Sequence, residues 1–144
     1  MGAEPAELIG FLAPYPLGVQ ELALEARSFL LKMLAPVSEL HYDATSAVCA
    51  GFAYGSKTAD VFVNLAVYPK HVTLVFGWGS SLSDPEKRLR GEGKRVRHLR
   101  LASMETLQDP YVLDLISQAS NAAIRKPDWQ PERIIKIYNG PKRR

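Results

Sequence analysis

The chain has 144 residues, of which 47% are apolar and 23% charged, and its net charge is +3; this balance is typical of one globular domain and excludes a largely disordered chain. No apolar run approaches the roughly 20 residues that cross a bilayer, the N-terminus lacks the pattern of a signal peptide, and the single cysteine, Cys49, cannot form an internal disulfide. We therefore expect residues 1–144 to form one soluble cytoplasmic domain with no membrane contact, and the sequence leaves its oligomeric state open.

A short helix is predicted over residues 5–12, because Pro5 suits the first turn of a helix and apolar residues follow it. A longer amphipathic helix is predicted over residues 19–34, where apolar side chains recur at intervals of three and four and charged ones fall on the other side. Pro36 ends this helix, because proline cannot continue it and disfavours the helical conformation of the preceding residue.

The apolar pattern then changes to a period of two, which is typical of strands. Four strands are predicted, over residues 45–54, 60–67, 71–77 and 94–101. The links between them are short and contain glycine or proline, so we expect neighbouring strands to run antiparallel.

A second long helix is predicted over residues 110–125, where Asp109 suits the N-cap and Pro110 the first helical position. Consecutive strands with a helix on either side of them in the sequence describe an α+β domain. We therefore expect an antiparallel sheet of four or more strands, with the two main helices, 19–34 and 110–125, packed on one of its faces.

Two motifs in the middle of the chain resemble those of a known family. One is apolar-Phe-x-x-Gly-x-x-Leu-x-Asp-Pro, and the other is Leu-x-Gly-x-Gly-Lys-x-x-Arg-x-apolar-x-apolar. Their residues in this chain are Phe76, Gly79, Leu82, Asp84, Pro85, Leu89, Gly91, Gly93, Lys94, Arg97, Leu99 and Leu101. In these motifs the chain resembles the YdhG-like domain family, a group of small bacterial proteins of unknown function, over about residues 18–124.

The resemblance implies a frataxin-like α/β sandwich, preceded here by an N-terminal extension and followed by a basic C-terminal tail. It implies no catalytic residues. Because some relatives carry an iron-chaperone label, it also implies an alternative role in binding iron. Hard cations prefer oxygen ligands, and the candidate ligands are Glu21, Glu25, Glu39 and Asp43.

The charge is unevenly distributed along the chain, which bears on partners rather than on fold. Residues 86–101 contain seven Lys and Arg side chains against two acids, whereas residues 1–43 contain six acids against two bases. On a strand, Lys94, His98 and Arg100 share one face, and two leucines favour the other face as the core side. The predicted anion-binding site comprises Arg88, Arg90, Lys94, His98 and Arg100.

Three hypotheses for the function follow. The first is a noncatalytic domain whose basic sheet face binds an anionic small molecule, a nucleic acid or another anionic partner. A simpler explanation of the same basic residues is that they are solvated surface charges without a ligand. The second is the iron-binding role. The third is an enzyme whose site is dispersed in the sequence, because neither a P-loop, a nucleophile elbow nor a zinc-binding spacing occurs.

Overall fold

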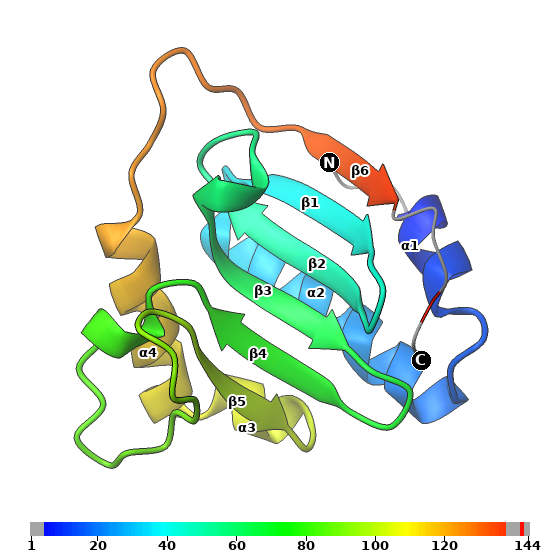
Figure 1. Ribbon diagram of the computed structural model, residues 1–144, viewed down its shortest axis with the longest axis horizontal. Coiled ribbons are helices and arrows are strands. Elements are labelled where there is room, and N and C mark those ends of the chain that lie inside the picture. The colour runs from blue at the N-terminus through cyan, green and yellow to red at the C-terminus, as the bar shows by residue number, and fades with distance from the viewer. Residues whose placement is uncertain (1–4, 138–141, 143–144) are drawn as a thin grey trace.

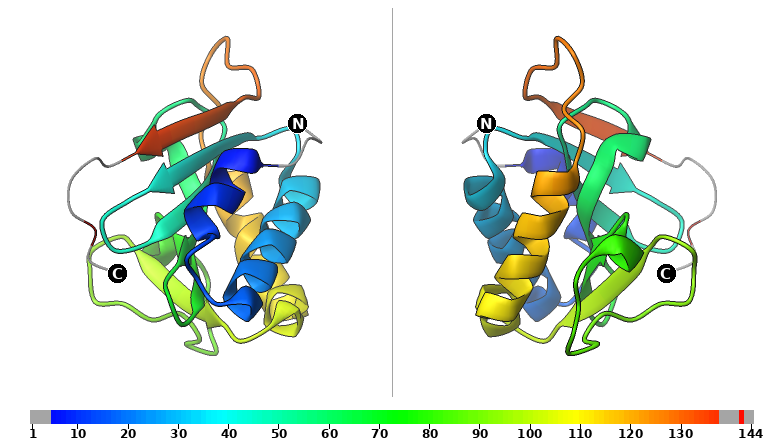
Figure 2. Two further views of the ribbon diagram at one scale, coloured as in Figure 1. Left: turned by 90° about the vertical axis from the view of Figure 1, so that its right-hand side faces the viewer. Right: turned by 90° about the vertical axis from the view of Figure 1, so that its left-hand side faces the viewer.

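In the part of the chain that the structure describes, residues 5–137 and 142, six strands form one sheet and the helices pack on one of its faces (Figures 1 and 2). The structure is a computed structural model. The helices are α1 (Ala6–Leu12), α2 (Leu17–Leu34), α3 (Met104–Gln108) and α4 (Pro110–Ala122). The strands are β1 (Ser38–Asp43), β2 (Val48–Ala53), β3 (Val61–Val67), β4 (Val72–Phe76), β5 (Arg97–Leu101) and β6 (Arg133–Ile137). A 3-10 turn, η1 (Thr58–Asp60), precedes β3, and another, η2 (Gly79–Ser81), follows β4.

The strand order across the sheet is β5-β4-β3-β2-β1-β6. Each strand from β1 to β4 pairs antiparallel with the strand that follows it in the chain, whereas β6 pairs parallel with β1. The sheet is therefore mixed, and the prediction of an antiparallel sheet is wrong at this edge. After α4 the chain passes the end of the sheet at which β1 begins, where Lys126 N donates to Tyr54 O at 3.0 Å, so β6 starts beside the start of β1.

The two main helices predicted from the apolar periodicity are confirmed as α2 and α4, with small shifts at their ends. Helix α2 begins two residues before the predicted 19 and ends at Leu34. Helix α4 begins at Pro110 as predicted, where the Asp109 side chain accepts a hydrogen bond from Tyr111 N, and it ends three residues before the predicted 125. Its start is well defined because an aspartate cap satisfies an amide that has no partner within the helix.

The predicted strands are present, but the sequence pattern missed two others. The predicted 45–54 is β2, and the strand before it, β1, was not predicted. The predicted 60–67 and 71–77 are β3 and β4, each slightly shorter. The strand predicted over 94–101 is β5, which begins only at Arg97. The last strand, β6, was not predicted.

The core lies between the sheet and the helices. Sheet residues Phe52, Leu65, Leu74, Phe76 and Leu101 face the helices, and each is at most 2% exposed. Burying one such side chain stabilises the fold by about 1.5–3 kcal/mol. The opposite face, here called the open face, lies away from helices α1 to α4 (Figure 2).

The two ends of the chain are only partly described. The predicted N-terminal extension contains α1, whose Leu8 and Leu12 are buried in the core, and residues 1–4 lie outside the described residues. Of the predicted basic tail, Lys142 is described, and its Nζ lies 3.5 Å from Asp43 Oδ2. Residues 138–141 and 143–144 lie outside the described residues.

Candidate functional site

Three basic side chains, Arg90, His98 and Arg100, lie together at the β5 edge of the open face, and this set is called the basic edge. His98 and Arg100 are on β5, opposite Val75 and Thr73 of β4. Arg90 lies opposite His98 in an antiparallel bridge. Residues paired in this way carry their side chains on the same face of a sheet. The bridge therefore adds a second arginine to the face that His98 and Arg100 share.

The side chains of the basic edge are exposed and form no ion pair with a carboxylate of residues 5–137 or 142. Some other cations among the described residues are paired, such as Lys126 with Asp60 at 3.3 Å. Like charges in neighbouring positions of a sheet repel one another. A bound oxyanion would remove this repulsion without breaking an internal ion pair, which makes the basic edge a candidate anion site.

A hollow of about 540 Å³ extends the basic edge toward the start of α2. Arg100, His71 and Lys70 lie on its walls, together with Gly18 of α2. The ring of His71 is stacked on that of Tyr68, with 4.7 Å between their centroids. Burial lowers the pKa of His71 from its ordinary value, and the positive charge of Arg100 lowers it further. His71 and Arg100 are therefore electrostatically coupled.

The structure separates Arg88 from the basic edge. Its Nη1 lies 3.3 Å from Asp109 Oδ2, and its guanidinium carbon lies 5.0 Å from the ring centroid of Tyr111. The backbone around it is held by Asp84, whose carboxylate accepts from Arg88 N at 3.0 Å and from Leu89 N at 2.9 Å. Arg88 thus attaches this loop to the start of α4.

Lys94 was predicted to share a strand face with His98 and Arg100, but it does not lie on a strand, because β5 begins only at Arg97. Lys94 is exposed in the bend that precedes the strand, and its carbonyl accepts from Ser80 Oγ at 2.8 Å. Arg97, the first residue of β5, donates through Nη1 to Gly93 O at 2.6 Å and to Val96 O at 2.8 Å. Arg97 therefore fixes the bend.

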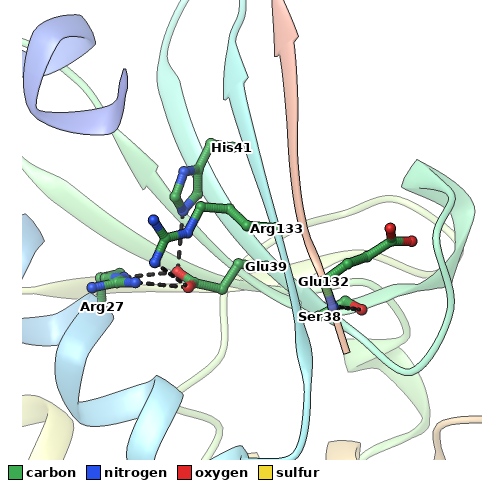
Figure 3. A network of polar contacts seen from close by, with 6 residues as sticks. All are labelled: Arg27, Ser38, Glu39, His41, Glu132 and Arg133. Carbon is green, nitrogen blue, oxygen red and sulfur yellow. Dashed lines mark hydrogen bonds and ion pairs between the residues drawn. The ribbon is translucent and has the colours of Figure 1, made fainter. Parts of the chain in front are cut away.

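A second polar cluster, which was not predicted from the sequence, is buried between α2 and β1 (Figure 3). Glu39 and His41 are fully buried on the helix-facing side of β1, and Arg27 of α2 is only 6% exposed. Glu39 accepts from Arg27 Nε and Nη2, both at 2.7 Å, and from Arg133 Nη2 of β6 at 3.4 Å. His41 Nε2 lies 3.1 Å from Glu39 Oε2. The cluster links α2, β1 and β6.

This buried cluster has the properties of a structural element. Burial alone would raise the pKa of Glu39, but hydrogen bonds from His41 and Arg27 and the charge of Arg27 lower it to about 2. The carboxylate is therefore ionised and fully engaged, which suits the positioning of strands better than proton transfer at neutral pH. A signal was present in the sequence, since Glu39 and His41 are two residues apart and so share a strand face.

The four candidate iron ligands do not converge. Glu21 and Glu25 are exposed on α2, where they line a shallow hollow with Glu105. Glu39 is engaged in the buried cluster, and Asp43 lies close to Lys142. Among the described residues, no group of three or more His, Cys, Asp or Glu side chains is arranged to hold a metal ion.

Comparisons with models of protein families, with the curated proteins and with the solved structures find no match to this chain. Within residues 5–137 and 142, no helix is both long and apolar enough to cross a membrane. The interpretation of the site therefore depends on its own geometry and charge.

Proposed function

We propose that this chain is a noncatalytic binding domain whose basic edge holds the phosphate groups of an anionic ligand. The observation that supports this proposal is the grouping of Arg90, His98 and Arg100 on one exposed face without a carboxylate partner among the described residues. Arginine presents a planar fork of donors that matches the oxygens of a phosphate. Two such forks flank a histidine here, so the edge suits several phosphate oxygens at once.

An extended polyanion fits this surface better than a small compact ligand. The three side chains follow a sheet edge, and the hollow beside Arg100 adds Lys70 and His71 to the same end. Binding of this kind is dominated by charge and needs no enclosing cavity. Inorganic polyphosphate and single-stranded nucleic acid both offer a row of phosphates, and the bases of a nucleic acid would add affinity only where aromatic side chains stack on them.

The proposal is tested by measuring the affinity of labelled inorganic polyphosphate and of a single-stranded oligonucleotide for three proteins. They are the wild type, Arg90→Ala/Arg100→Ala, and the control Lys32→Ala/Lys136→Ala. The control removes the same charge from exposed positions on α2 and on β6, the opposite edge of the sheet. We expect the first variant alone to lose most of the affinity, and affinity to fall steeply with salt. Equal losses in both variants would show nonspecific attraction and contradict the proposal.

Membership in the YdhG-like family and a frataxin-like arrangement stay predictions. Helices packed on one face of a sheet support them, whereas the parallel strand β6 departs from the antiparallel sheet that was expected. The iron-binding alternative has less support than the basic edge because Glu39 is buried and fully paired. Unchanged iron binding after Glu21→Gln combined with Glu25→Gln would exclude these two carboxylates as ligands.

A further inference from the structure

An apolar groove lies between one end of the sheet and helix α4. Its volume is about 340 Å³. Its walls are Phe62 and Phe76 of the sheet, Trp78 and Leu82 of the segment after β4, and Ala119 and Ala122 of α4. The groove is at the end of β4, whereas the hollow beside Arg100 is at its start, so the two sites are separate.

Hydrogen bonds hold the walls of the groove in place. The segment after β4 is fixed to α4 because Ser83 N donates to Gln118 Oε1 at 2.7 Å and Gln118 Nε2 donates to Ser83 O at 3.2 Å. Behind the groove, the ring of Phe62 stacks on that of Tyr54, with 4.9 Å between centroids. Its volume falls in the range of about 300–1,000 Å³ that small-molecule sites occupy. The groove is therefore preformed and of a size for a small ligand.

Two arginines stack on aromatic rings beside the groove, although neither lines it. Trp78 is 57% exposed, and the guanidinium carbon of Arg95 lies 4.7 Å from the centroid of its ring. The guanidinium carbon of Arg125 lies 3.9 Å from the ring centroid of Tyr54. Neither arginine forms an ion pair with a carboxylate among the described residues, and the nearby Asp60 is paired with Lys126.

We propose that this groove binds a small amphiphile with an apolar chain and a terminal carboxylate. The chain would displace water from the apolar walls, and the carboxylate would accept hydrogen bonds from Arg95 above Trp78. A neutral apolar ligand would leave Arg95 unused. A docked protein segment would need a larger surface, since specific interfaces bury about 800 Å² on each partner. This inference does not depend on the proposed function of the basic edge.

Calorimetric titration with octanoate, 1-octanol and acetate separates the contributions of chain and charge. We expect octanoate to bind more tightly than octanol, and acetate not to bind. The variant Arg95→Ala should bind octanoate about tenfold more weakly, the effect of losing a charge-assisted hydrogen bond, with little change for octanol. Lys94→Ala is the matched control, since it removes the same charge at the preceding exposed position and should leave octanoate binding unchanged.

A second pair of variants tests the location of the chain. Ala122→Leu places a larger side chain in the groove, whereas Asn121→Leu places it at the neighbouring exposed position of α4 that does not line the groove. Both residues are exposed, so neither change disturbs the core. We expect loss of octanoate binding in the first variant only. Absence of octanoate binding to the wild type, equal binding of octanoate and octanol, or equal effects of the two leucines would each overturn the proposal.

Discussion

Arg90 and His98 lie directly opposite each other in an antiparallel bridge, in which Arg90 N donates to His98 O at 2.8 Å and His98 N donates to Arg90 O at 2.9 Å. This backbone pairing brings Arg90 onto the face that carries Arg100. Gly91 follows the bridge with a φ of +127°, a conformation that favours glycine, and an added Cβ would meet Val96 O at 3.1 Å. The glycine thus allows the chain to turn back beside β5.

Replacement of Gly91 should weaken the bridge and the basic edge together. We expect Gly91→Ala to lower the free energy of unfolding by about 1–3 kcal/mol through backbone strain and to speed amide hydrogen exchange at Arg90 and His98. Gly93→Ala is the matched control, because no atom lies within 4 Å of the added Cβ. The bridge would not depend on Gly91 if both variants exchanged at the wild-type rate.

The pKa of His71 should report on the occupancy of the basic edge. It is lowered first by burial and then by the charge of Arg100, so Arg100→Ala should raise it by removing the second cause. A phosphate bound beside Arg100 should raise it as well, because an anion stabilises the charged imidazolium. An NMR titration of the His71 ring protons measures both effects, and an unchanged pKa in Arg100→Ala would show that the two side chains are not coupled.

The buried carboxylate of Glu39 should contribute strongly to stability at neutral pH. Glu39→Gln leaves the guanidinium of Arg27 without its carboxylate partner, and we expect it to lower the free energy of unfolding by about 3–5 kcal/mol. Urea denaturation at pH 7 measures this loss. Glu21→Gln is the control, since this side chain is exposed and should change stability by no more than about 0.5 kcal/mol.

The carboxylate of Glu39 should also make the free energy of unfolding decrease at acidic pH. The pKa of Glu39 in the folded chain, about 2, lies below the ordinary value of 4.5, so folding favours the ionised form. The resulting stabilisation, about 3 kcal/mol, is fully present above pH 4.5 and is lost as the pH falls toward 2. Glu39→Gln should remove this part of the pH dependence. If the free energy of unfolding of Glu39→Gln fell with decreasing pH as it does in the wild type, other carboxylates would be responsible for the loss of stability in acid.

The alternation of side chains on β5 could be predicted from the sequence, because Leu99 and Leu101 mark the core side and so place His98 and Arg100 on the open face. Arg90 was included in the predicted site, but its position opposite His98 was not predicted, because it depends on a bridge formed across a turn. Lys94 was misplaced because the alternation was extended into the bend before Arg97.

The buried cluster shows a different limit of the sequence pattern. Charged residues are rarely buried unless paired, so Glu39 and His41 obscured the strand β1, and Arg27 was not expected on the buried stripe of α2. Each is buried because the others provide its partner. Such compensation depends on residues far apart in the chain, as does the pairing of β6 with β1.

An NMR titration of the ¹⁵N-labelled protein with inorganic polyphosphate at low salt shows directly whether the basic edge holds phosphate groups. We expect the largest chemical-shift changes at Arg90, His98 and Arg100, with smaller ones at His71, and we expect these changes to disappear in Arg90→Ala/Arg100→Ala. Signals of the exposed Lys32 and Lys136 should move little. Shift changes spread evenly over all exposed cations, or no change at any of these residues, would show that the basic edge is not a phosphate site.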